Sequence, residues 1–231
     1  MRSPGEASAT QPALIRLHDR AGGVRSLRGK RSHRAGSHPR GARASVATGW
    51  FVPFSARLAR KGIAPPAEIA ERIAVTDRAS PAMGARMVAK AWTDPAFRTL
   101  LLEDGTRAAE SLGIMMRGAP PLGVLENTPE IHHLVVCTLC SCYPRAVLGY
   151  PPFWFKSAAY RARAVRDPRG LIAEWGTMLP DDVRVRVVDS TADYRWMVLP
   201  VRPAGTAGWD EERLAAIVRE GDMIGVTIPR L

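Results

Sequence analysis

Between residues 65 and 112, apolar side chains recur at three- and four-residue intervals, the spacing of one face of an α-helix. Two prolines and an acidic first turn begin the first stretch, residues 65–73, in which two isoleucines lie four residues apart. We expect a second helix over residues 81–92 and a third over residues 95–112, with Gly105 weakening its middle. The pattern predicts a helical N-terminal arm.

From residue 122 onward, short apolar runs are flanked by turn residues, which is typical of strands. We expect strands over residues 122–125, 134–136, 183–188 and 196–199. Prolines or aspartates before apolar stretches predict further helices over residues 151–160, 167–175 and 210–219. The predicted fold class is α+β, a helical N-terminal arm followed by a mixed α/β C-terminal domain.

Positive charge is concentrated at the start of the chain. The 231 residues carry a formal net charge of +11, and residues 1–50 account for +8 of it, with ten Lys or Arg against two acidic residues. This segment is rich in Gly, Ser, Ala and Arg and lacks an apolar period, so it cannot offset the entropy of ordering. We predict a flexible basic tail over residues 1–60, a helical arm over 61–117 and a metal-binding catalytic domain over 118–231.

The charge distribution and hydropathy narrow the function classes. Because most of the excess charge lies in the tail, a nucleic-acid partner is not expected for the folded part. No stretch reaches the roughly 18 to 20 apolar residues that cross a bilayer. We therefore expect a cytoplasmic protein with no membrane partner.

All three cysteines, Cys137, Cys140 and Cys142, lie within six residues of one another. A disulfide framework needs pairs spread across the fold, whereas a local cluster indicates a ligand set in a reducing compartment. Three thiolates this close favour a borderline or soft metal.

The identity of the metal is open from the spacing alone. Structural zinc usually takes two separated ligand pairs, and no second C-x-x-C follows. The adjacent His132 and His133 are expected at the surface or behind the ligands rather than among them. The tight spacing of Cys140, Ser141 and Cys142 also suits a site in which two backbone amide nitrogens join the sulfurs, and such ligation favours a low-spin trivalent ion over zinc.

The segment Val136-Cys-Thr-Leu-Cys-Ser-Cys-Tyr143 resembles the metal-binding signature of nitrile hydratase alpha subunits. Further similarity to that family lies in residues 84–95, 126–129, 147–152, 160–169 and 202–206. The resemblance covers residues 62–231 in all. The gamma subunit of thiocyanate hydrolase is a close relative that shares the cysteine segment.

The resemblance implies a non-corrin cobalt or non-haem iron centre. Its ligands would be the Cys137 thiolate, a Cys140 sulfinate, a Cys142 sulfenate and the main-chain nitrogens of Ser141 and Cys142. Thr138 inside the cysteine segment and Tyr143 after it resemble the cobalt-type members. Co(3+) is therefore expected, with Fe(3+) as the alternative.

The implied reaction is the addition of water to a nitrile, giving the amide, with the metal as Lewis acid or activator of bound water. Cys142, as sulfenate, is the candidate nucleophile or general base, and Ser141 contributes either a hydroxyl or only a small side chain and an amide. The family implies a beta subunit that supplies two arginines to the oxidised sulfurs, an α2β2 heterotetramer and an activator or metallochaperone protein.

Two departures from the family affect the expected substrate. Arg145 stands where the family commonly has tryptophan, and residues 118–121 replace a stretch that often carries a pocket glutamine. The aromatic residues 153–155 are expected in the core or at a subunit contact. Four arginines either fix loops around the cysteines, serve an interface or form a solvated helix face: Arg161, Arg163, Arg166 and Arg169.

Two alternatives to nitrile hydratase remain open. The first is the gamma subunit of a thiocyanate hydrolase. The second is an inactive metal-binding module whose basic tail binds nucleic acid through phosphate contacts.

Overall fold

The computed structural model describes residues 56–140 and 142–231, which fall into two compact units divided after Arg78. The described part of the first unit contains a helical stretch over residues 56–60 and the helix α2 (Pro66–Arg78). A proline begins α2, Glu68 lies in its first turn and Arg78 in its last, so the end charges complement the helix dipole. The helix predicted over residues 65–73 is confirmed and continues to Arg78.

Three helices form one layer of the second unit. They are α3 (Pro81–Thr93), α4 (Pro95–Glu103) and α5 (Gly105–Ser111). Asp94 and Asp104 cap α4 and α5, because each side chain accepts a hydrogen bond from a backbone N–H of the following turn. The helix predicted from residue 95 is confirmed, but its unbroken extension to residue 112 is wrong, because the helix ends at Glu103 and a new one begins after Asp104. A Cβ on Gly105 would lie 2.7 Å from the carbonyl oxygen of Leu122, so glycine permits this close approach.

Four strands within the described residues form two parallel pairs. They are β1 (Leu122–Glu126), β2 (Ile131–Val136), β3 (Arg184–Asp189) and β4 (Arg195–Leu199). β1 pairs with β4 and β2 pairs with β3. The four predicted strands are confirmed, but β2 begins earlier than its apolar run and includes both histidines. It is buried from His132 to Val136, as expected for a strand covered on both faces.

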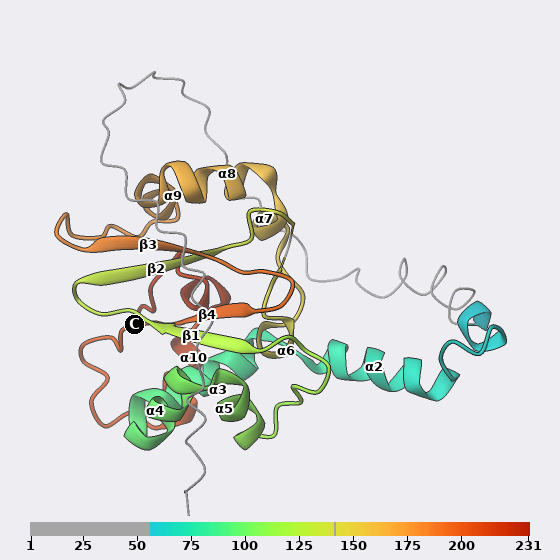
Figure 1. The fold of residues 1–231 in the computed structure, drawn as a ribbon. Helices are drawn as coiled ribbons and strands as arrows, with labels where there is room; N and C mark the ends of the chain where they lie inside the picture. The colour runs from blue at the N-terminus through green and yellow to red at the C-terminus, as the bar shows by residue number, and fades with distance from the viewer. Residues whose placement is uncertain (1–55, 141) are drawn as a thin grey trace, which may run out of the picture. The chain divides into compact units, whose positions relative to one another are not determined.

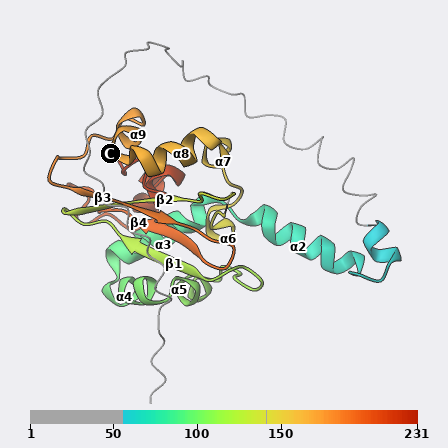
Figure 2. The same ribbon diagram turned by 45° about the horizontal axis from the view of Figure 1, so that its top comes forward.

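The strands lie between two layers of helices, as Figure 1 shows and the turned view in Figure 2 repeats. On one side α4 and α5 pack against β1. On the other side α8 (Ala158–Arg166) packs against β2, and α9 (Pro168–Glu174) packs against β3. The helix predicted over residues 151–160 is two helices, because Ser157 ends α7 (Phe153–Lys156) and caps α8 by accepting a hydrogen bond from the Tyr160 N–H.

The C-terminal part of the chain returns to the helical layer formed by α3, α4 and α5. α10 (Glu211–Ile217) packs against α3, and the 3-10 helix η1 (Glu220–Met223) follows it. The predicted helix over residues 210–219 is confirmed, with Asp210 as its cap. Helices and parallel strands thus make the mixed α+β fold that the sequence predicts. Within residues 56–140 and 142–231, no helix has the length and apolar character needed to span a membrane.

Candidate metal centre

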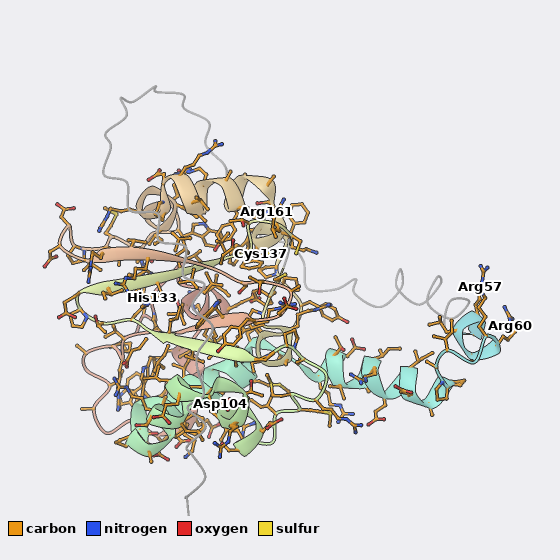
Figure 3. The ribbon with its side chains drawn as sticks, viewed as in Figure 1. Arg57, Arg60, Asp104, His133, Cys137 and Arg161 are labelled. Atoms are coloured by element: carbon orange, nitrogen blue, oxygen red, sulfur yellow. The ribbon has the colours of Figure 1, made fainter. Side chains whose placement is uncertain are left out.

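The cysteine segment leaves the end of β2, where Val136 is followed directly by Cys137. β3 runs parallel to β2 and ends opposite it, with Asp189 paired to Val136. The carboxyl ends of two parallel strands therefore meet beside the cysteines, which is the edge of an open α/β sheet where ligands usually bind. Figure 3 labels Cys137 at this end of β2 and Arg161 on α8. The next helix, α6 (Arg145–Leu148), begins three residues after Cys142.

The three cysteine sulfurs converge. The Sγ atoms of Cys137 and Cys140 are 3.5 Å apart, and those of Cys140 and Cys142 are 3.2 Å apart. All three lie within 4.8 Å of one another, and no disulfide joins them. Cys137 and Cys142 are buried, whereas Cys140 is exposed. Ser141, which the sequence places between the second and third cysteines, lies outside the described residues.

The donor set suits a soft or borderline transition metal. Burial raises the pKa of the Cys142 thiol to about 12, and hydrogen bonding with Cys140 and Cys137 acts in the same direction. The positive charge of Arg195 acts in the opposite direction. A bound metal cation would lower the pKa of the Cys142 thiol again, because a cation holds a coordinating thiol as thiolate. Three sulfurs at these separations therefore fit a metal ion better than they fit a structural role as free thiols.

Side chains distant in sequence anchor both ends of the cysteine segment. Asp189 accepts two hydrogen bonds from Thr138, one from the backbone N–H at 3.0 Å and one from the hydroxyl at 2.5 Å. Tyr143, which is 1% exposed, donates its hydroxyl to Glu220 Oε1 at 2.5 Å. Neither carboxylate is predicted from the sequence, because nothing local to Asp189 or Glu220 marks it. Their roles arise from the pairing of β2 with β3 and from the return of η1.

The four arginines of residues 161–169 divide into different roles. Arg161 donates to the carbonyl oxygen of Cys140 at 2.9 Å, so it does fix the loop around the cysteines. Arg169 donates to the backbone carbonyls of residues 179, 180 and 183 and holds the loop before β3. Arg163 pairs with Glu174 and Asp167. Arg166 is exposed at the end of α8.

The adjacent histidines are buried, so of the two positions expected for them, at the surface or behind the ligands, the surface position is wrong. His132 Nε2 lies 2.7 Å from the Gly225 carbonyl and therefore carries a proton, while its Nδ1 lies 3.1 Å from the Asn127 side-chain nitrogen. Asn127 Oδ1 accepts the His133 backbone N–H at 2.8 Å. Burial lowers the pKa of His132, and it lowers the pKa of His133 to about 4. Neither ring belongs to the cysteine cluster.

Of the two departures from the family pattern, only Arg145 lies near the cysteines in sequence. Arg145 is exposed at the start of α6, and its guanidinium lies 4.7 Å from the ring centroid of Tyr150. Residues 118–121 lead into β1, and Pro121 accepts a hydrogen bond from the Arg195 N–H at 2.9 Å. Of the three aromatic residues before α8, Phe155 is buried in the core and Phe153 is 86% exposed.

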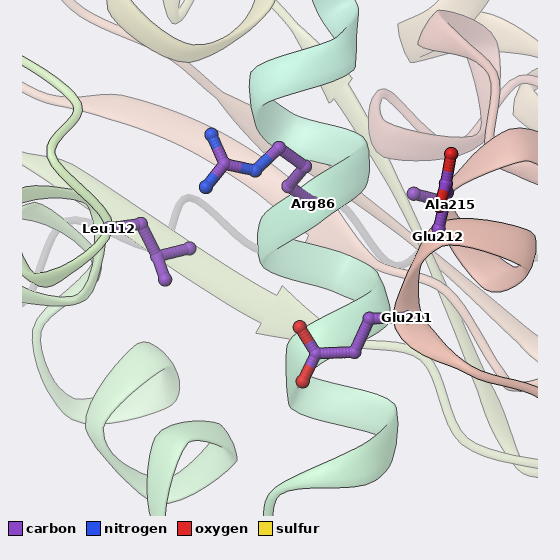
Figure 4. A pocket seen from close by; sticks show the side chains of 5 residues that line it. All are labelled: Arg86, Leu112, Glu211, Glu212 and Ala215. Carbon is purple, nitrogen blue, oxygen red and sulfur yellow. The ribbon is translucent and has the colours of Figure 1, made fainter.

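A surface hollow lies elsewhere, on the helical layer of α3 and α10 (Figure 4). Its lining residues are Arg86, Leu112, Glu211, Glu212 and Ala215. Glu211 is already engaged there by Lys90 at 3.6 Å and by the Thr93 hydroxyl at 3.2 Å. Within residues 56–140 and 142–231, the group of three or more possible metal-binding side chains is the cysteine cluster, and none of its members lines this hollow.

Comparison with known proteins places the chain in a family. Residues 51–227 match the model of nitrile hydratase, alpha chain. The low-molecular-weight cobalt-containing nitrile hydratase subunit alpha of Rhodococcus rhodochrous is 52% identical over 149 residues, 64% of this chain and 72% of the relative. The thiocyanate hydrolase subunit gamma of Thiobacillus thioparus is 47% identical over 161 residues, 65% of this chain and 66% of the relative.

Solved structures agree with the sequence comparison. A recombinant thiocyanate hydrolase with partially modified cobalt centres has a TM-score of 0.72 and 40% identity, covering 78% of this chain and 89% of that one. A double histidine-to-alanine variant of an Fe-type nitrile hydratase from Comamonas testosteroni has a TM-score of 0.69 and 39% identity, covering 80% and 91%. With its cysteine cluster at the end of β2, this chain belongs to the nitrile hydratase alpha-chain family, whose enzymes are hydro-lyases.

Proposed function

We propose that this chain is the alpha subunit of a nitrile hydratase that adds water to a nitrile and releases the amide. The observation that carries the proposal is the convergence of the three cysteine sulfurs within 4.8 Å on the loop after β2. A cluster of thiols without a disulfide is the expected arrangement of a thiolate-rich metal centre. The cobalt-containing relatives from Rhodococcus rhodochrous and Pseudonocardia thermophila support the same function.

We assign as metal ligands the Cys137 thiolate, the sulfurs of Cys140 and Cys142, and the main-chain nitrogens of Ser141 and Cys142. Cys137 is 1% exposed, which supports its remaining a plain thiolate. Cys140 is exposed to solvent, which supports its oxidation to the sulfinate. The sulfenate state of Cys142 rests on the family resemblance.

The metal, when bound, supplies a trivalent Lewis acid. The chain's own contribution is to hold the ligands through the Thr138 and Tyr143 contacts and to present Cys142 as nucleophile or general base. Ser141 supplies a hydroxyl near the ligands or only a small side chain. Co(3+) is the proposed metal because two similar alpha subunits are named as cobalt-containing; Fe(3+) is the alternative, since an Fe-type enzyme shares the fold.

The active enzyme is proposed to include a beta subunit in an α2β2 assembly, with an activator protein for metal loading. Leu139, in the middle of the cysteine segment, is 88% exposed, and Cys140 beside it is exposed as well. An apolar side chain so exposed beside a reactive centre is what a covering partner would bury. We also propose that the tail ends at residue 60, that the helical arm ends at residue 117 and that the catalytic domain follows it. The proposed location of the enzyme is the cytoplasm.

Thiocyanate hydrolysis is the second candidate, and Arg145 favours it. This exposed cation lies three residues beyond Cys142, and a positive charge beside the centre would attract an anion such as thiocyanate more strongly than a neutral nitrile. The identity to the Thiobacillus thioparus gamma subunit supports this candidate too.

Co-expression with the adjacent beta-type subunit in cobalt medium tests these proposals. The purified complex would be analysed for metal and assayed for amide from a simple nitrile and for thiocyanate consumption. Replacing Cys137 with serine should abolish metal binding, whereas Arg166→Gln, a change at an exposed position of α8, should leave it intact. Stoichiometric cobalt with neither activity would leave only the inactive metal-binding module, and a zinc-filled site would overturn the cobalt assignment.

A further inference from the structure

Arg161 reaches the cysteine segment from another element through a hydrogen bond to its backbone. It belongs to α8, which packs against β2, and its side chain is partly buried. Nη1 donates to the carbonyl oxygen of Cys140 at 2.9 Å and to that of Lys156 at 3.0 Å. Figure 3 shows Arg161 on the α8 side of the cysteine segment. The guanidinium therefore ties the segment to the end of α7.

The positive charge of Arg161 is not neutralised by an acid in residues 56–140 and 142–231. The ion pairs formed there involve Lys90, Arg98 and Arg163. Arg163, two residues further along α8, shows the contrast, since it pairs with Glu174 at 2.6 Å and with Asp167 at 3.0 Å. The charge of Arg161 is thus directed at backbone carbonyls, one of which belongs to the second cysteine.

The carbonyl oxygen of Cys140 and the nitrogen of Ser141 belong to one peptide bond. Resonance spreads charge between the nitrogen and the oxygen of a peptide. When the nitrogen binds a metal as an anion, part of its negative charge is carried by that oxygen. A guanidinium that already donates to the oxygen then makes a charge-assisted hydrogen bond, which is shorter and stronger than a neutral one.

The metal-bound centre carries a net negative charge, which a nearby cation such as Arg161 would offset. Three anionic sulfurs and two anionic peptide nitrogens carry more negative charge than a trivalent ion offsets. An uncompensated charge in a partly buried loop is costly, so a cation that also fixes the loop stabilises the metal-bound form selectively.

We propose that Arg161 is a positioning residue of the metal centre, which holds the Cys140–Ser141 peptide and offsets its charge when the metal is bound. The inference rests on the proposed function, because it takes the main-chain nitrogen of Ser141 as a ligand. Its consequence is slower loss of the metal, independent of any contact between Arg161 and the substrate.

The test compares the unchanged chain with Arg161→Gln, Arg161→Lys and Arg166→Gln, each co-produced with the beta-type subunit in cobalt medium. Arg166 is the matched control because it is an exposed arginine on the same helix. The measurements are bound cobalt per complex, the sulfur-to-cobalt charge-transfer absorption and the rate of cobalt release to a chelator. Circular dichroism of each variant reports folding.

We expect Arg161→Gln to release cobalt about tenfold faster than the unchanged chain, because the variant loses one charged hydrogen bond. The release rate of Arg161→Lys should lie between those of Arg161→Gln and the unchanged chain, because lysine keeps the positive charge but lacks the planar guanidinium. The release rate of Arg166→Gln should match that of the unchanged chain. Equal release from Arg161→Gln and the unchanged chain overturns the proposal, as does an equal effect of Arg166→Gln. If Arg161→Gln misfolds, the test relies on Arg161→Lys. Cobalt release from Arg161→Lys as slow as from the unchanged chain then refutes the positioning role of Arg161.

Failure of the proposed function has a different signature. The unchanged complex would then take up no cobalt, or would bind cobalt and release no amide from a nitrile. A chain that binds cobalt normally while Arg161→Gln retains it equally well refutes only the role of Arg161.

Discussion

The pH dependence of stability should reveal the buried His133 on the strand that carries Cys137. Its ring is held neutral because burial, the positive charge of Arg186 and the neighbouring His132 all lower its pKa, to about 4 from the ordinary 6.5. The unfolded chain takes up a proton below pH 6.5, whereas the folded chain resists it until about pH 4. The unfolded state therefore binds more protons in this window, and stability, complete above pH 6.5, declines as the pH falls through it.

The size of the loss follows from the shift. Between pH 7.5 and pH 5, a shift from 6.5 to about 4 weakens folding by about 2 kcal/mol. His133 is only 7% exposed, so solvent screens this contribution little. A change of this size is a large fraction of the stability of a typical domain.

Urea unfolding at pH 7.5 and pH 5 would measure the effect in the unchanged chain and in His133→Gln. The glutamine keeps a side-chain donor for Asn127 but cannot titrate, and the other ionisable groups contribute alike to both chains. The unchanged chain should lose about 2 kcal/mol more than the variant between the two pH values. Equal losses would show that His133 is not held neutral by its surroundings.

Three further substitutions test the surroundings of the cysteines. Asp189→Asn replaces the carboxylate that accepts the Thr138 hydroxyl hydrogen bond, so cobalt release to a chelator should become about fivefold faster. An unchanged release rate would contradict an anchoring role for Asp189. Tyr143→Phe removes the hydroxyl donated to Glu220 and should lower the free energy of unfolding by about 1–2 kcal/mol in urea, whereas an unaltered midpoint would show the contact to be neutral. Arg145→Trp should raise the ratio of nitrile to thiocyanate turnover about tenfold, since it removes an exposed cation, and a constant ratio would separate Arg145 from substrate choice.

The sequence determined the features that depend on neighbouring residues. Three cysteines within six positions can converge without help from distant parts of the chain, so the ligand cluster was predictable. Strand runs and helix starts follow from local apolar patterns and capping residues, and most of them are confirmed. Helix breaks were harder: the cap residues Asp104 and Ser157 end one helix and begin the next, and an apolar period that continues across them hides the break.

Only the tertiary structure decided what surrounds the cysteines. Asp189 lies 51 residues from Thr138, and Glu220 lies 77 residues from Tyr143. These contacts depend on the parallel pairing of β2 with β3 and on the return of η1, which no local pattern specifies. The burial of the two histidines has the same origin, because packing on both faces of β2 encloses polar side chains that Asn127 and Gly225 satisfy. Covalent spacing fixes which donors can meet, whereas long-range packing fixes their orientation, their charge environment and their exposure.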